Sequence, residues 1–237
     1  MRYGEVAHFS HPQHLLRLEH HDTPFRCDGC REVGIGARFR CPHPGCDHDL
    51  HRQCALPLSP PPPPLRHPFY PRCAFAFLPR APGPPRYCNA CGRDMAGYVY
   101  HCRACGFDLH PCCAALPHAL DAGGGVRLYL HPDSKAGVAC HRCGHRGRSW
   151  SYRSHCGSFS LHVACVVDML VESWYNVGRH KGVGRGGSGA ASNVYDDRMV
   201  VAGNGRYRVP ARTSRNPLIH DEFSVTFMKI VTNRHDL

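Results

Sequence analysis

The sequence predicts a tandem of small, irregular α+β modules, each with short strands and one short helix, and each nucleated by bound metal. Three observations favour this class. Cysteine and histidine recur in three spaced copies, the copies begin 61 and then 52 residues apart (Cys27, Cys88, Cys140), and few apolar residues lie between the cysteines. A unit of this length buries too little apolar surface to be stable alone. We therefore expect metal binding to supply much of its folding free energy.

The three copies share one order of cysteine and histidine residues. The first copy runs through Cys27, Cys30, Cys41, Cys46, His51 and Cys54. The second copy runs through Cys88, Cys91, Cys102, Cys105, His110 and Cys113. The shorter third copy has Cys140, Cys143, Cys156, His162 and Cys165. Each copy closes with His-x2-Cys, and this helical i, i+3 spacing points both side chains to the same face.

Zinc explains this cysteine usage better than disulfide bonds do. The first ten residues hold no apolar run of the kind that opens a secretory signal, so we expect an intracellular chain in the cytoplasm or nucleus, where thiols stay reduced. Zinc takes four tetrahedral thiolate or imidazole ligands, and a Cys-x2-Cys turn supplies two of them. A disulfide framework would leave the 20 histidines without a role. No stretch approaches the roughly 18 apolar residues of a membrane span.

A more specific signature accompanies these ligands. It consists of His-Pro-x-His at residues 11–14, an aromatic residue two positions before the third cysteine (Phe39), Leu-His-x2-Cys from Leu50, and a closing Leu-Pro at Leu56. Over about residues 8–175 the chain resembles the divergent C1 (DC1) Cys/His-rich family of plants, which is related to C1-type zinc domains and usually occurs as tandem repeats. In C1 domains the first and third ligand groups share one metal, and the second and fourth share another.

This resemblance implies a ligand set for each site. In copy one, the first site has Cys27, Cys30, His51 and Cys54, and the second has His14, Cys41, Cys46 and His11 in place of the family's final cysteine. In copy two, the first site has Cys88, Cys91, His110 and Cys113, and the second has His67, Cys73, Cys102 and Cys105. In copy three, Cys140, Cys143, His162 and Cys165 complete the first site, and the second needs His155 or Cys156 with His118 or His131. We expect five or six structural zinc ions and a spare thiol at Cys112.

The expected domain organisation follows the copies. The modules occupy residues 8–58, 67–117 and 118–176, the last with a degenerate second site. Five consecutive prolines within residues 59–66 predict a stiff polyproline II linker, and residues 177–237 read as a flexible Gly-rich loop and tail. Aromatic residues such as Tyr98 and Trp150 are expected to form separate mini-cores beside the metals. Apolar residues at helical spacing from Val166 to Trp174 predict a longer helix in copy three.

The sequence favours a binding module over an enzyme. Four protein ligands on each metal leave no open position for catalysis. The formal charge of +11 suits acidic proteins, anionic lipid or nucleic acid, but no base-reading motif is present. The C1 resemblance implies signal transduction, yet the interval from Cys30 to Cys41 is shorter than a typical diacylglycerol-binding loop and lacks its Gln-Gly segment. We therefore expect a protein partner. Thiol-disulfide oxidoreductase activity, diacylglycerol binding and zinc-dependent transcription regulation remain alternatives.

Overall fold

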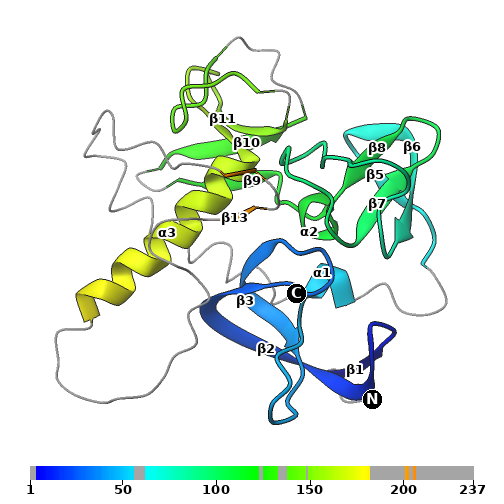
Figure 1. The fold of residues 1–237 in the computed structure, drawn as a ribbon. Coiled ribbons are helices and arrows are strands. Elements are labelled where there is room, and N and C mark those ends of the chain that lie inside the picture. The colour runs from blue at the N-terminus through cyan, green and yellow to red at the C-terminus, as the bar shows by residue number, and fades with distance from the viewer. Residues whose placement is uncertain are drawn as a thin grey trace.

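The computed structural model describes residues 4–55, 62–122, 125–132, 138–147, 149–181, 201–202 and 205–206. Within these ranges, three four-stranded antiparallel sheets follow one another along the chain, and each is followed by a helix (Figure 1). The sequence predicted small α+β modules in tandem, and the structure has small modules in tandem that are mostly β-strand. We call the three units, each a sheet with its helix, modules 1, 2 and 3.

Module 1 is built on one long strand. Its elements are β1 (Glu5–His8), β2 (His11–Arg26), β3 (Val33–Arg40), β4 (Asp49–His51) and α1 (Arg52–Ala55). Burial alternates along most of β3, because successive side chains of a strand point to opposite faces of the sheet. Leu16, Phe39 and Leu50 fill the inner face, so the aromatic residue before the third cysteine belongs to the core.

Module 2 repeats this order with shorter strands. Its elements are β5 (Leu65–His67), β6 (Tyr70–Leu78), β7 (Val99–Cys102), β8 (Phe107–Leu109) and α2 (Pro111–Ala114). Proline at the first position of α2 suits a helix start, where its missing N–H leaves no hydrogen bond unmade. Strand β5 begins at Leu65, inside the segment expected as a linker, and residues 59–61 of that segment lie outside the described residues.

Module 3 ends in a much longer helix. Its elements are β9 (Ala119–Asp121), β10 (Arg127–His131), β11 (Ser151–Ser154), β12 (Ser160–His162) and α3 (Val163–Lys181). The 19 residues of α3 include the stretch from Val166 to Trp174, whose apolar spacing predicted a helix, and they extend past the expected module end at residue 176. A two-stranded hairpin, β13 (Val201–Ala202) with β14 (Gly205–Arg206), follows in the expected tail, the rest of which lies outside the described residues.

The modules do not keep separate mini-cores. Modules 2 and 3 share one hydrophobic core, in which the fully buried Trp150 of module 3 donates a hydrogen bond from Nε1 to the Tyr70 hydroxyl of module 2 at 3.0 Å. The core of module 1 includes Tyr98 of module 2. Pooling side chains buries more apolar area than three isolated units of this size achieve, which is the physical reason for the difference from expectation.

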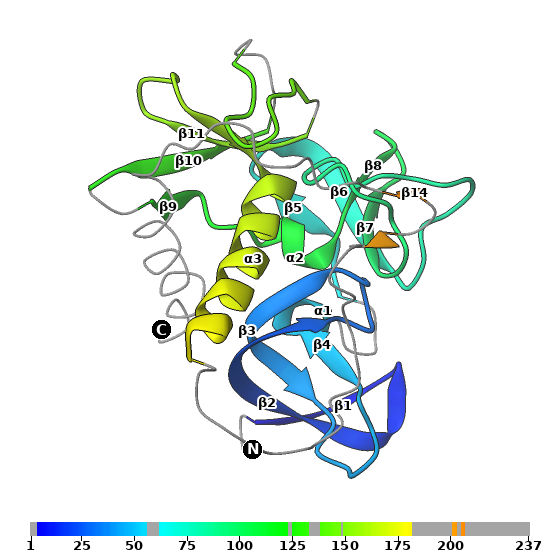
Figure 2. The same ribbon diagram turned by 60° about the vertical axis from the view of Figure 1, so that its left-hand side comes forward.

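Helix α3 and one arginine hold module 1 against the other two. In Figure 2, α3 runs from module 3 past α2 toward the sheet of module 1. The guanidinium of Arg93 in module 2 contacts Glu32 of module 1 at 2.8 Å and Asp168 of α3 at 2.6 Å. Burial opposes the charge of Arg93, but Asp168 and Glu32 outweigh it and raise its pKa. One side chain thus links all three modules.

Candidate metal centres

Each Cys-x2-Cys pair lies on the same tight turn. The residue after the second cysteine donates its backbone N–H to the carbonyl of the first cysteine, at 2.8 to 2.9 Å in all three modules. That residue has positive φ, at Arg31, Gly92 and Gly144. Glycine adopts this conformation without strain, whereas arginine does so at a cost. This turn directs the sulfur atoms of both cysteines toward the same metal position.

A backbone N–H also reaches the first sulfur of each pair. The amide of His51 donates to Cys27 Sγ at 3.3 Å, and its counterparts in modules 2 and 3 donate to Cys88 and Cys140 at 3.4 Å. Burial alone would raise the pKa of Cys88, but hydrogen bonds from Cys113, Cys91 and His110 together lower it. A lowered pKa favours thiolate, the form that binds metal.

The first site of every module gathers the residues that the sequence assigned to it. The structure brings together Cys27, Cys30, His51 and Cys54, then Cys88, Cys91, His110 and Cys113, then Cys140, Cys143, His162 and Cys165. In each group the histidine Nδ1 faces the sulfurs, at 3.3 to 3.4 Å from the second cysteine and 3.8 to 4.0 Å from the last. The histidine is the last residue of β4 and of β12 and directly follows β8, and the helix after it carries the last cysteine.

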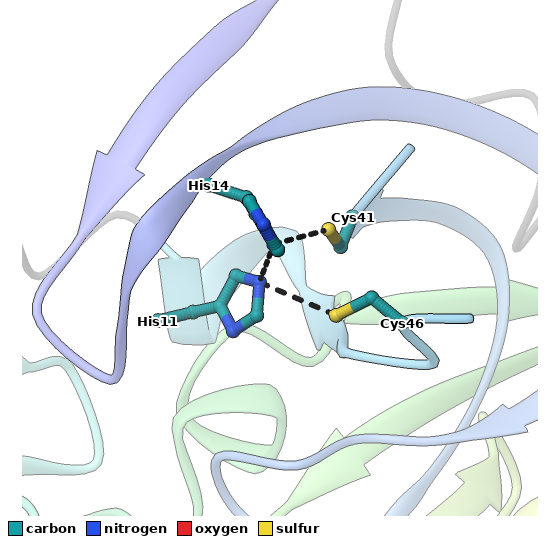
Figure 3. Close-up of side chains that lie close together, drawn as sticks. All are labelled: His11, His14, Cys41 and Cys46. Atoms are coloured by element: carbon teal, nitrogen blue, oxygen red, sulfur yellow. Dashed lines mark hydrogen bonds between the residues drawn. The ribbon is translucent and has the colours of Figure 1, made fainter. Parts of the chain in front are cut away.

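The second site of module 1 contains two histidines (Figure 3). His11 and His14 project from the start of β2, and Cys41 and Cys46 flank the loop after β3. His14 Nδ1 lies 3.5 Å from Cys41 Sγ, His11 Nε2 lies 3.4 Å from Cys46 Sγ, and the two imidazoles approach to 3.3 Å. His11 therefore lies beside Cys41 and Cys46, where it was expected in place of the family's final cysteine.

These four groups fit zinc. With Zn–S of about 2.3 Å and Zn–N of about 2.0 Å, tetrahedral ligands lie about 3.5 Å apart for sulfur and nitrogen. The sulfur to nitrogen distances of 3.3 to 4.0 Å surround that value. In module 2 the remaining nitrogen of His110, Nε2, donates to the Asp94 carbonyl at 3.1 Å. Such an outer contact fixes the tautomer that leaves Nδ1 free for metal.

The second site of module 2 contains three sulfurs without the expected histidine. Cys73, Cys102 and Cys105 come together, but His67 does not join them. Instead, His67 is buried beside Trp150, and its Nδ1 accepts the Phe69 N–H at 3.1 Å.

The pairing of strands explains why His67 lies elsewhere. His67 pairs with Tyr70 across the β5–β6 turn just as His8 pairs with His11 across the β1–β2 turn. His8 is also buried, and its Nδ1 accepts the N–H of Ser10, two residues on. His67 therefore corresponds to His8 and closes a turn. The sequence had aligned it three residues away, with His11.

The second site of module 3 is not assembled in the described residues. Its strand pairing places Ser154 at the position of Cys41 and Val126 at that of His14. The predicted ligand Cys156 is exposed and hydrogen-bonds with the hydroxyls of Ser154 and Ser158. His155 contacts the ring of Tyr129, His118 contacts Phe69, and no group of three ligands in the described residues includes either histidine or Cys156.

Cys112 has a role in packing that the sequence did not indicate. We had expected a spare thiol, but Cys112 packs against the cores of both module 1 and the other two modules. Its thiol interacts with Cys113, its neighbour, and with Cys30 of module 1. It thus lies between two first sites. Its position directly beside His-x2-Cys was the only signal in the sequence.

Comparisons with known proteins agree with this geometry for the first two modules. Residues 9–55 and 73–114 match the family model described as C1 domain. Neither the curated proteins nor the solved structures contain a match to this chain. None of the helices in the described part combines the length and apolar character needed to cross a membrane. Residues 9–55 and 73–114 are therefore similar to C1 domains, occur in tandem and carry Cys/His clusters that suit zinc.

Proposed function

We propose that this chain is a tandem zinc protein of the divergent C1 (DC1) type, with three modules, that binds another protein in intracellular signal transduction. The observation that carries the proposal is an apolar groove that all three modules build together, with a volume of about 340 Å³. That volume lies at the lower end of the range for ligand and peptide pockets. No single module contains this groove.

The lining of the groove suits a protein segment. Val33 and Ile35 come from β3, Leu116 follows α2, and Val167 and Leu170 come from α3. Charged side chains of both signs also line the groove, with Glu32 and Arg93 in their ion pair and Arg52 at the start of α1. An apolar centre with a polar, charged rim is the usual anatomy of a protein–protein interface.

The metal clusters support this groove from behind. His51, Cys91 and Cys113 belong both to first sites and to its wall. Bound zinc would supply rigid tetrahedral crosslinks there, while the chain's own apolar residues would contact the partner. The Cys-x2-Cys pair of each first site lies in a group with a histidine and a third cysteine. That placement favours structural zinc over a redox dithiol, and the five groups of the described residues suggest five ions.

A matched pair of substitutions tests the groove. Val167→Asp places a carboxylate in it, and Val126→Asp makes the same change at a half-exposed position outside it. The zinc-loaded full chain and both variants would be immobilised, and proteins captured from a cell extract would be quantified by mass spectrometry. Zinc content and circular dichroism would verify folding of each variant.

We expect wild type and Val126→Asp to capture the same set of proteins. Val167→Asp should capture at least about tenfold less of them, which corresponds to about 1.4 kcal/mol of binding free energy. Identical capture by all three chains would overturn it. Binding to diacylglycerol vesicles that is tight, resists high salt and is lost in Val167→Asp would replace the protein partner by a lipid.

A further inference from the structure

We propose that Cys73, Cys102 and Cys105 form a three-thiolate zinc site whose fourth position is open to a ligand from solution. The other four groups in the described residues have four protein ligands each, and this group has three. Within the described residues, no other cysteine, histidine, aspartate or glutamate brings a ligand atom within 4.8 Å of all three sulfurs. This inference goes beyond the proposed function, because it does not depend on any protein partner.

Strand register identifies the residue that is missing. Arg40, just before Cys41, pairs with Arg17 on β2, and His101, just before Cys102, pairs with Ala76 on β6. Counting back along β6 from Ala76 therefore places Cys73 at the position of His14 and Tyr70 at the position of His11. The position of His11, which completes the second site of module 1, holds a tyrosine in module 2.

Tyr70 interacts with Trp150 and Phe107 instead of the three cysteines. Its hydroxyl accepts the indole N–H of Trp150 at 3.0 Å, and its ring packs on Phe107. Burial raises its pKa, so the hydroxyl keeps its proton and is a poor metal ligand. Tyr70 in place of a histidine thus links module 2 to module 3 and leaves the second site of module 2 without a fourth ligand.

The three sulfurs retain the geometry of a binding site. Cys102 and Cys105 lie at either end of a turn closed by the Gly106 N–H, which donates to the Cys102 carbonyl at 2.8 Å. Cys73 reaches across from β6, with its sulfur 2.7 Å from that of Cys105. Two thiolates on one zinc lie about 3.8 Å apart, so metal binding would move these sulfurs apart by about 1 Å.

Exposure places the open position at the surface. Cys73 and Cys102 are buried, but Cys105 is exposed to solvent. Three thiolates on Zn²⁺ leave a net charge of about −1 and one free coordination position. Sites of this kind exchange their fourth ligand, whereas sites with four protein ligands are closed. We infer that the ion accepts a soft donor such as a small thiolate, and that it leaves the protein faster than the other ions.

The test compares four full-length chains: wild type, Tyr70→His, Tyr70→Phe and Cys105→Ser. Tyr70→His restores the imidazole found at His11. Tyr70→Phe loses the same hydrogen bond to Trp150 without adding a ligand, so it is the matched control. Each chain would be purified with reductant and loaded with zinc. Zinc content and the rate of zinc transfer to a chromophoric chelator would then be measured.

We expect wild type and Tyr70→Phe to release one zinc equivalent at least about tenfold faster than the rest, the size of effect that loss of supporting ligands typically has. Tyr70→His should slow that phase by about the same factor, and Cys105→Ser should lose it together with one ion. In wild type loaded with Co²⁺, 2-mercaptoethanol should change the absorption of one ion equivalent.

Three results would overturn the inference. The first is release of every ion from wild type in one slow phase. The second is an unchanged zinc content in Cys105→Ser. The third is an intact mass of the reduced, zinc-loaded protein that is about 2 Da low because Cys73 and Cys105 have formed a disulfide. Each of these leaves the groove and its Val167 test unaffected.

Discussion

Cys156 and His67 resemble metal ligands in the sequence, but strand position gives each another environment. Cys156 lies in the turn after β11, where its sulfur is 3.3 Å from the Ser154 hydroxyl and 2.9 Å from that of Ser158. These hydrogen bonds lower the pKa of the exposed Cys156 thiol to about 7. His67 is buried in the core shared by modules 2 and 3.

Cys156 should be the first cysteine to be alkylated in the zinc-loaded protein. A pKa of about 7 makes it half thiolate near neutral pH, whereas an ordinary thiol reaches that point near pH 8.5. Iodoacetamide labelling followed by peptide mass spectrometry should show a single fast site, with a half-maximal rate near pH 7. Substitution by serine should remove the fast phase. Faster labelling of Cys112 would contradict the placement of these two thiols.

His67 should make the folded protein sensitive to mild acid. Burial and nearby His118 lower its pKa below the ordinary 6.5, and its Nδ1 accepts a backbone hydrogen bond that protonation would break. The unfolded chain therefore takes up a proton that the folded chain resists. This stabilising contribution is present above pH 6.5 and is lost as pH falls toward the folded pKa.

Urea unfolding at saturating zinc, between pH 7.5 and 5.5, measures this contribution. Asparagine can accept the same backbone N–H but does not titrate, so His67→Asn should flatten the decline of unfolding free energy. The change can reach at most about 1.4 kcal/mol per pH unit. Asparagine at the exposed His21 is the control, and an equal flattening there would sink the interpretation.

Among the elements, the loop before β7 brings the backbones of modules 1 and 2 into direct contact. The Tyr98 N–H donates to the Gly29 carbonyl at 2.9 Å, and Gly97 precedes it. A Cβ on Gly97 would lie 2.0 Å from that carbonyl oxygen, far inside van der Waals contact. The two backbones can meet only because position 97 lacks a side chain.

Gly97→Ala should therefore loosen module 1 from module 2. We expect a loss of about 1–3 kcal/mol of unfolding free energy, in the range of strained backbone positions, with much faster hydrogen exchange at the Tyr98 amide. Gly4→Ala, where a Cβ meets nothing within 4 Å, should change neither. Unchanged exchange at Tyr98 in the Gly97 variant would show that this contact does not hold the modules together.

Helices α1 and α2 carry cysteines of different importance. Cys54→Ala removes a ligand from a site worth on the order of 10 kcal/mol of apparent binding free energy, so module 1 should unfold and lose zinc. Cys112→Ala leaves a small void at the module junction and should cost about 1–2 kcal/mol. Thermal denaturation with metal analysis measures both changes. Equal damage would mean that the ligand sets around these helices are assigned wrongly.

For the whole molecule, the sequence predicted the local Cys/His groups but not the contacts between modules. Cys-x2-Cys and His-x2-Cys spacing fix local turns, so the first-site groups follow directly from them. The position of His67 depends on strand register, and the sequence alignment placed His67 three residues away from its true counterpart, His8. The hydrogen bond from Trp150 to Tyr70 and the link through Arg93 join residues 80 and 61 positions apart, respectively. No local pattern encodes such contacts.

The number of bound zinc ions tests most directly the claim that metal organises this fold. Native mass spectrometry of the full chain, purified with zinc and reductant and without chelator, counts the ions on each molecule. Four complete groups and one three-sulfur group predict five. Chelation should remove them together with the tertiary circular dichroism signal. Three ions or fewer on a folded chain would contradict the scheme of two sites in each of the first two modules.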